Sequence, residues 1–336
     1  MTPSFSLAWH ICCYTLRYNS RCSVITATLQ VMKLAFLLRR RQLQLLVLLV
    51  TAPFFYVSYV VQQSRVTARY TTVRHLDATN QLLGTTPPLP SIEQRREMYR
   101  EIRRRVSQPS TEPLRLKSPG RRDHSQHGQS RFVDDHLRGR RNGFFVESGA
   151  SDGETGSNSL FFERYRNWTG LLVEANPQLY RQLLEKRRHA YAINACISPP
   201  RRPVSAIFKP AAGIGGLADQ MSSEHLALVN RHGVSNINVT CYSINDIIAA
   251  LNIDHIDYWS LDVEGAELAI LGSLDWTSMP RVDVISVEYM MKRADGKRDQ
   301  QGSVEKLQQI RQLFDETAAY QQIGIKNHVD VIFART

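Results

Sequence analysis

The segment Asn142-Gly-Phe-Phe-Val-Glu-Ser-Gly-Ala-Ser-Asp-Gly153 combines a short apolar run with a glycine-rich turn. Residues 144–146 are too few for a helix and are preceded by glycine, so they predict a buried strand. Glu147 ends this strand. A strand that passes through such a turn into a helix lets backbone N–H groups approach a ligand closely. The segment therefore predicts a nucleotide-type site in an α/β fold.

The segment Thr169-Gly-Leu-Leu-Val-Glu-Ala-Asn-Pro177 repeats this design. Its apolar run, residues 170–173, predicts a second strand that ends in another acid, Glu174. The carboxyl ends of strands in an open α/β sheet meet at the crevice where ligands bind. We therefore expect Glu147 and Glu174 to project into one crevice.

The order of acids and glycines distinguishes two cofactors. A dinucleotide site requires three glycines and then an acid about 20 residues further on. Here Glu147 precedes the turn, Ser151 holds the middle glycine position, and Glu174 lies beyond that spacing. An acid before the turn suits the cationic amino-acid end of S-adenosylmethionine, and Glu174 can accept hydrogen bonds from ribose hydroxyls. The predicted cofactor-binding residues are Glu147, Gly149, Ala150, Ser151, Asp152, Gly153 and Glu174.

Three ordered segments resemble the FkbM-type methyltransferase domain: Phe145-Val-Glu-Ser-Gly-Ala-Ser-Asp-Gly-Glu154, Asn167-Trp-Thr-Gly-Leu-Leu-Val-Glu-Ala-Asn-Pro177 and Ile256-Asp-Tyr-Trp-Ser-Leu-Asp-Val-Glu-Gly-Ala-Glu-Leu268. The resemblance covers roughly residues 143–336 and is closest to the arthropod membrane protein Star and its relatives. It implies a class I methyltransferase fold. For Star-like members it implies a single-pass type II membrane protein that helps growth-factor precursors, such as ligands of the EGF receptor, through the endoplasmic reticulum, Golgi and endosomes.

Two candidate catalytic residues follow the strand expected at 256–261. Asp262 lies where the FkbM resemblance places an acid facing the methyl donor and acceptor, and Glu264 follows it. The next expected strand, 282–287, ends in Glu288. Carboxylates at adjacent strand ends can share a divalent cation or act as acid and base. Because no histidine or further ligand stands at metal spacing, we predict no metal.

The rest of residues 143–336 alternates helical and strand patterns. Asn176 and Pro177 predict a helix start, and Ser243 and Asp246 predict a helix cap, which makes Asp246 structural. Residues 190–198 predict a third strand. Residues 201–242 show no clear pattern before the cap at Ser243, and within them 213–217 form either a flexible lid over the site or a loop with turns. A C-terminal hairpin completes a doubly wound sheet of about seven strands with an antiparallel close.

The net charge of +11 would suit a nucleic-acid partner, but its distribution argues against one. Residues 143–336 hold slightly more acidic than basic side chains, so the excess of lysine and arginine lies before residue 143. A folded domain without a basic surface excess is a poor match for a phosphate backbone. We expect no nucleic-acid binding.

Residues 43–61 form an apolar stretch of about the length that crosses a bilayer. The arginines 39–41 precede it, which favours residues 1–42 as the cytosolic side and the large domain as lumenal. Residues 1–31 are a cytosolic tail, a mitochondrial presequence or a mispredicted upstream segment. Residues 62–142 are basic and poor in apolar side chains, so we expect a largely disordered stem with a short helix at 93–106.

Glycosylation sequons begin at Asn167 and Asn238 and are compatible with a lumenal domain. Cys196 and Cys241 either pair in an oxidising lumen or are two small buried side chains.

Two functional classes remain: an S-adenosylmethionine-dependent O-methyltransferase, and a membrane-anchored scaffold that binds client proteins during export. Ser151 in a glycine position and the absence of histidine from the three motifs favour the scaffold, while Glu147 and Glu174 favour cofactor binding. The balance favours a Star-like trafficking scaffold, with the methyltransferase as the alternative.

Overall fold

The computed structural model describes residues 90–199, 203–211, 213–317 and 319–336. Within these ranges, no helix has the length and apolar character needed to cross a membrane. The expected tail (1–42), the expected membrane span (43–61) and the first part of the expected stem (62–89) lie outside the described residues.

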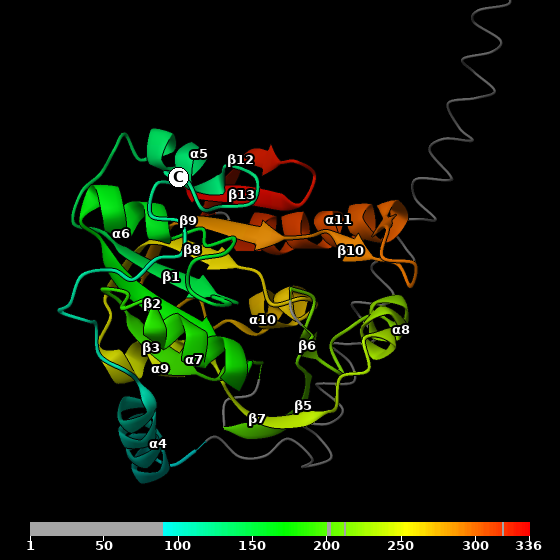
Figure 1. The fold of residues 1–336 in the computed structure, drawn as a ribbon, viewed down its shortest axis with the longest axis horizontal. Coiled ribbons are helices and arrows are strands. Elements are labelled where there is room, and N and C mark those ends of the chain that lie inside the picture. The colour runs from blue at the N-terminus through cyan, green and yellow to red at the C-terminus, as the bar shows by residue number, and fades with distance from the viewer. Residues whose placement is uncertain (1–89, 200–202, 212, 318) are drawn as a thin grey trace, which may run out of the picture. The chain divides into compact units, whose positions relative to one another are not determined.

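A seven-stranded sheet forms the centre of the domain (Figure 1). Its order is β12-β13-β9-β8-β1-β2-β3, and β13 runs in the opposite direction to the other six strands. From β1 the chain moves outward through β2 and β3, and later outward on the other side through β8 and β9, so the β1/β8 boundary is the topological switch point where ligands bind in such sheets. The predicted α/β sheet and its C-terminal hairpin are confirmed. The strands are β1 (Phe144–Ser148), β2 (Thr169–Glu174), β3 (Tyr191–Asn194), β8 (His255–Leu261), β9 (Arg281–Glu288), β12 (Tyr320–Lys326) and β13 (Asp330–Arg335).

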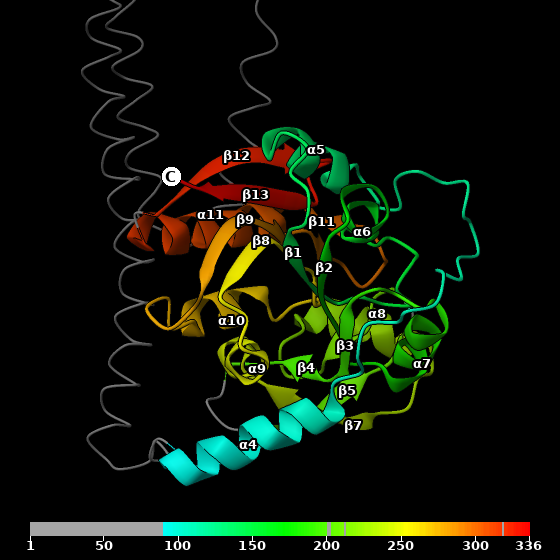
Figure 2. The ribbon, with the colours of Figure 1, turned by 90° about the vertical axis from the view of Figure 1, so that its left-hand side faces the viewer.

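Helices cover both faces of this sheet (Figures 1 and 2). Successive strand residues point to opposite faces, so Phe145 joins one apolar core while Val146 joins the other. The core containing Phe145 includes side chains of α5 (Gln129–His136), α6 (Leu160–Arg166) and α7 (Pro177–Glu185). The core containing Val146 includes side chains of α4 (Ile92–Arg105), α9 (Ile244–Leu251), α10 (Glu267–Ser273) and α11 (Gln300–Thr317).

Two helix starts follow the predicted caps. The Asn176 side chain accepts hydrogen bonds from the N–H groups of Gln178 and Leu179, and Pro177 is the first residue of α7. The Ser243 hydroxyl accepts from the N–H of Asp246 at the start of α9. Such side chains satisfy N–H groups that have no partner within the helix, so Asp246 is structural, as predicted.

A second, four-stranded sheet was not predicted. Its order is β4-β7-β5-β6, made of β4 (Cys196–Ile197), β7 (Ile237–Tyr242), β5 (Val204–Lys209) and β6 (Gly216–Leu217). The strand expected at 190–198 is therefore divided between two sheets at Ala195. The segment 201–242, whose elements were not predicted, contains β5, β6 and β7. It also contains α8 (Ser223–Arg231). These strands are short, and their pairing partners lie far away in the sequence, so local periodicity gives a weak signal.

Residues 107–142 are not the disordered spacer that their composition predicted. Glu154, which is buried, accepts hydrogen bonds from the N–H groups of Lys117 and Ser118, both at 2.7 Å. Gln129 donates to Asp330 at 2.6 Å, and both side chains are buried. Composition underestimates the order of such a segment. Hydrogen bonds to buried carboxylates hold it in place, in addition to apolar burial.

Helix α4 also belongs to the folded domain, although the sequence placed the domain boundary at residue 143. Met98 and Ile102 are buried in the same core as α9, and Arg103 donates to the carbonyl of Ala250 at 2.9 Å. Figure 2 shows α4, in cyan, beside α9. Ser107 then forms two backbone hydrogen bonds with Ala192 and so covers the free edge of β3. The two short strands β10 (Met291–Lys292) and β11 (Arg298–Asp299) form a separate hairpin.

Candidate functional site

A cleft lies at the carboxyl ends of β1, β2 and β8, beside the switch point. The two acids predicted to frame a site, Glu147 and Glu174, both line it. So do five further predicted residues: Gly149, Ala150, Ser151, Asp262 and Glu264. Of the predicted residues, Asp152 and Gly153 do not line the cleft. The structure therefore brings the two strand-end acids and the two candidate catalytic acids to one cavity.

The glycine-rich turn is packed against the end of β8. Gly149 has φ +85°, and a Cβ atom there would lie 1.8 Å from the carbonyl oxygen of Asp262. The N–H groups of Gly149 and Ala150 both donate to the carbonyl of Val173. Asp152 shapes the turn, because its carboxylate accepts from the N–H groups of Glu154 and Thr155. The conformation of the turn is thus fixed by contacts within the protein, without a ligand.

Glu174 is the acid at the end of β2. Its carboxylate accepts hydrogen bonds from the N–H groups of Ser151 and Asn176, both at 2.7 Å. It is 5% exposed, and burial raises its pKa to about 7, although the two backbone donors lower it. An ionised carboxylate has about four lone-pair positions, so Glu174 keeps capacity for further donors from the cleft.

Glu147 has a different environment. Its carboxylate accepts from the hydroxyls of Ser157 and Ser159 and from the N–H of Asn158. It is only 3% exposed. Glu147 therefore holds the loop before α6 in place, and three protein donors already occupy it.

Three acids cluster beyond β8 and β9. Carboxylate oxygens of Asp262, Glu264 and Glu288 lie within 4.8 Å of one another. Burial, followed by neighbouring carboxylates, raises the pKa of Asp262 to about 8 and that of Glu264 to about 8. The Lys292 ammonium donates to Glu264 at 2.5 Å and lies 3.9 Å from Glu288. The Lys292 ammonium therefore partly balances the negative charge of the three carboxylates.

Glu267 is structural. It is completely buried, and its carboxylate accepts from the N–H groups of Val263 and Gly265 and from the Lys306 ammonium. Burial raises its pKa, but Lys306 and the backbone donors outweigh burial and hold the pKa below its ordinary value. Glu267 therefore shapes the loop that carries Asp262 and Glu264.

Asp262→Asn should stabilise the protein at high pH. The folded-state pKa of about 8 lies above the ordinary value of 3.8, so the stability that this carboxyl contributes is complete below pH 3.8 and is lost as the pH rises through 8. Asparagine cannot ionise. We expect the melting temperature of the variant to exceed that of the wild type by at least about 4 °C at pH 9, with the gap shrinking toward pH 4. Thermal unfolding by circular dichroism measures this, with the exposed Asp219→Asn as control; a gap independent of pH would contradict it.

Sequence reasoning missed two parts of the site. The small sheet supplies apolar walls through Phe208 and Leu217, and the adjoining segment 213–215 also lines the cleft. The glycines of this segment could have indicated that it borders the site, because a lid over the site was one of the two roles considered for residues 213–217. Asn158, in the polar triplet before α6, lines the cleft as well. It was missed because the sequence Ser157-Asn-Ser159 is typical of an ordinary helix start.

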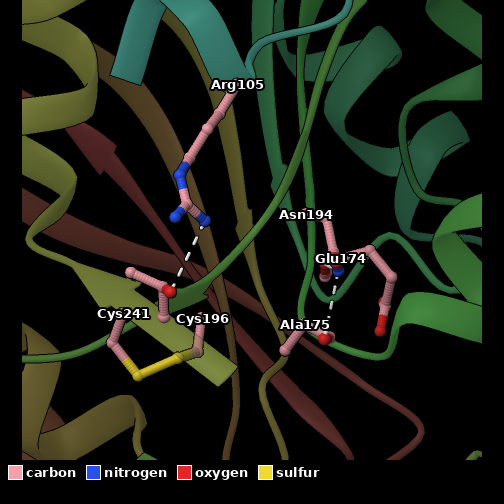
Figure 3. The surroundings of a disulfide bond; sticks show 7 residues. Arg105, Glu174, Ala175, Asn194, Cys196 and Cys241 are labelled. Atoms are coloured by element: carbon pink, nitrogen blue, oxygen red, sulfur yellow. Dashed lines mark hydrogen bonds between the residues drawn. A yellow bond between two sulfur atoms is a disulfide. The ribbon is translucent and has the colours of Figure 1, made fainter. Parts of the chain in front are cut away.

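Cys196 and Cys241 are joined by a disulfide that links β4 to β7 (Figure 3). Figure 3 shows Asn194, Ala175 and Glu174 beside this bond. The side chain of Asn194 donates to the carbonyls of Glu174 and Ala175, and Cys196 itself lines the cleft. The disulfide therefore joins two neighbouring strands of the small sheet, and Cys196 places it at the wall of the cleft. Both sequon asparagines, Asn167 and Asn238, are exposed.

Removing this disulfide should destabilise the protein. The bridge spans a sequence separation of 45, for which the loop-closure model gives a stabilisation of about 4 kcal/mol. We expect the double variant Cys196→Ala/Cys241→Ala to unfold at a lower urea concentration than the wild type. A reductant should lower the wild-type midpoint to that of the double variant and leave the variant unchanged. Equal midpoints without reductant would contradict the expectation.

Comparison with known proteins gives a family match and distant structural matches. Residues 147–321, just over half of the chain, match the family model described as the methyltransferase FkbM domain. No curated protein matches the chain. A methyltransferase FkbM from Methylobacillus flagellatus KT is 13% identical, with a TM-score of 0.35, over 58% of this chain and 44% of that chain. The METTL16 methyltransferase domain is 8% identical, with a TM-score of 0.35, over 62% of this chain and 65% of that chain.

A third structural match is the 1,6-didemethyltoxoflavin-N1-methyltransferase of Burkholderia thailandensis, whose structure contains S-adenosylhomocysteine. It is 8% identical, with a TM-score of 0.31, over 74% of this chain and 92% of that chain. The present chain spans less than half of the Methylobacillus protein and just under two thirds of the METTL16 domain.

Proposed function

Because this chain belongs to the family of proteins that carry a methyltransferase FkbM domain, we propose that it binds S-adenosylmethionine in the cleft at the ends of β1, β2 and β8 and methylates an acceptor oxygen. The observation that carries the proposal is the convergence of Glu174, the Gly149 turn and Asp262 on one cavity at the switch point. The doubly wound sheet with a reversed strand β13 also supports the class I methyltransferase fold.

The residues of the cleft fit this cofactor. The carboxylate of Glu174 supplies the acceptor that ribose hydroxyls need. Leu179, Ile197, Phe208 and Leu217 supply apolar walls for a flat base. Gly149 leaves no space for a side chain between the turn and Asp262. Once bound, the cofactor supplies a methyl group activated on a sulfonium sulfur.

The protein's own contribution would be positioning and proton transfer. Holding the acceptor hydroxyl in line with the methyl group lowers the entropic part of the barrier. The carboxylate of Asp262 or Glu264 would receive the hydroxyl proton, and a pKa of about 8 suits a base that works near neutral pH. Lys292, through its contact with Glu264, holds that side chain in place.

A membrane-anchored scaffold is the second candidate. It corresponds to the Star-like role in export of growth-factor precursors through the secretory and endosomal system. The observation that favours it is that both acids bind protein groups: Glu147 accepts three protein hydrogen bonds and Glu174 accepts two. Both acids would therefore have a structural role even in a domain that binds no ligand. A lumenal position, with anchoring through residues 43–61, remains part of this proposal; the disulfide and the two exposed sequon asparagines support it.

Calorimetric titration separates the two candidates. We expect the full-length protein to bind S-adenosylmethionine, and Glu174→Ala to weaken this binding at least about 10-fold because charged acceptor hydrogen bonds to the ribose are lost. Glu185→Ala on the exposed side of α7 is the control and should bind like the wild type. Absence of heat at millimolar ligand in the wild type would leave the scaffold as the function.

A further inference from the structure

Asn158 carries a buried acceptor atom that has no partner. In the part of the chain that the structure describes, its Oδ1 is one of four buried side-chain atoms without a hydrogen bond. Asn158 is 5% exposed and lines the cleft. Native proteins pair nearly all such atoms, so an unpaired one calls for a ligand or another explanation.

Two contacts fix how the Asn158 amide lies. Its Nδ2 donates to the hydroxyl of Ser260 on β8 at 2.9 Å, and its backbone N–H donates to Glu147 on β1. The remaining amide atom, Oδ1, has no protein partner. Because β1 lies between β8 and β2 in the sheet, Asn158 stands on the opposite side of the switch point from Glu174. Its partner Ser260 precedes Asp262 by two residues, so Asn158 is near the Asp262 end of the cleft.

Asn158 is bonded to a buried anion, while the buried Arg188 guanidinium, which donates to the neighbouring Ser157 and Ser159, is paired with Glu163. Glu147, the acid expected from the sequence to receive the ammonium of the cofactor, is 3% exposed and already accepts three protein hydrogen bonds. One of those donors is the backbone of Asn158. The buried anion is therefore bonded to the backbone of a cleft-lining residue whose side-chain acceptor has no protein partner.

We propose that Asn158 Oδ1 accepts a hydrogen bond from the α-ammonium group of S-adenosylmethionine and of its product. The inference rests on the proposed function. Asn158 is then the contact residue for the amino-acid end. Glu147 and Ser260 are positioning residues that hold its backbone and its amide, and Glu174 serves the ribose at the other end.

The test compares two ligands that differ at the amino-acid end. S-adenosylhomocysteine carries the ammonium, and 5′-methylthioadenosine keeps the nucleoside and the sulfur but lacks the amino acid. In calorimetric titrations of the full-length protein, Asn158→Leu, similar in size but without an acceptor, should bind S-adenosylhomocysteine about 10- to 100-fold more weakly. Its affinity for 5′-methylthioadenosine should not change. Asn158→Asp, which keeps an acceptor oxygen, should retain binding of S-adenosylhomocysteine.

Each outcome decides the inference. An equal loss for both ligands, or no loss for either, in Asn158→Leu would overturn it while leaving the proposed function intact. A wild-type protein that binds neither ligand would overturn the proposed function and the inference together. If Asn158→Leu fails to fold, Asn158→Asp carries the test alone: selective loss of S-adenosylhomocysteine binding in that variant would overturn the inference, and retained binding of both ligands would support it.

Discussion

Gly149→Ala should remove most of the stability of the domain and all of its cofactor binding. The new Cβ atom would lie 1.8 Å from the carbonyl oxygen of Asp262, a backbone atom that no side-chain rotation can move away. The φ of +85° adds the strain that L-residues experience in this region. We expect a loss of more than about 4 kcal/mol, seen as a melting temperature lower by about 10 °C or more in circular dichroism.

Gly233→Ala is the matched control for this substitution. Gly233 also has a positive φ, +65°, but nothing lies within 4 Å of the position where its Cβ atom would be. The control therefore carries the backbone strain without the collision, and we expect a loss of about 1–2 kcal/mol. Equal losses in the two variants would show that the contact between the turn and Asp262 is not what restricts position 149 to glycine.

A chain that begins at residue 143, where the sequence placed the domain boundary, should fail to fold cooperatively. The deletion removes Met98, Ile102 and Val133 from the two apolar cores. It also leaves Glu154 and Asp330 buried without the donors that residues 90–142 supply. Exposed apolar cores and the hydrogen bonds lost at these buried carboxylates each cost several kcal/mol by rough estimate, and together they exceed half of a typical domain's stability.

Two longer fragments serve as controls for the truncation. The fragment 90–336 should give a single cooperative melting transition. The fragment 107–336, which lacks only α4, should melt cooperatively but at a lower temperature, because it keeps the polar contacts and loses the packing of α4 on α9. If the fragment 143–336 melted at the same temperature as 90–336, the segment before residue 143 would be dispensable.

The central sheet was predictable because its signals are local. Each parallel strand is a short buried apolar run, and the ends of β1, β2 and β8 coincide with acids and glycines that stand out in the sequence. The caps at Asn176 and Ser243 also depend on neighbours within three residues. The fold around the switch point therefore follows from features that a single sequence shows.

The small sheet and the segment before residue 143 were not predictable in this way. In β7 exposed and buried residues do not alternate regularly over its six positions, and its partners are β4 and β5, which lie far back in the sequence. Residues 107–142 look disordered because they are basic and polar. Their order depends on carboxylates such as Glu154 and Asp330, whose burial no local pattern reveals.

The site was predicted in part. Glu174, Gly149, Asp262 and Glu264 line one cleft, as the strand-end argument expects. Glu147 lies in the same cleft, but its carboxylate is engaged by the loop before α6, which the sequence does not show. That difference changes which residue is free to contact the amino-acid end of a cofactor.

The most direct test of the account is a crystal structure of the protein grown with saturating S-adenosylhomocysteine. The account expects electron density for the ligand in the cleft between the ends of β1, β2 and β8, with the ribose hydroxyls against the carboxylate of Glu174 and the amino-acid end toward Asp262. Density for the nucleoside at another place, or a cleft that stays empty at saturating ligand, would contradict the claim that this fold is built around a cofactor site.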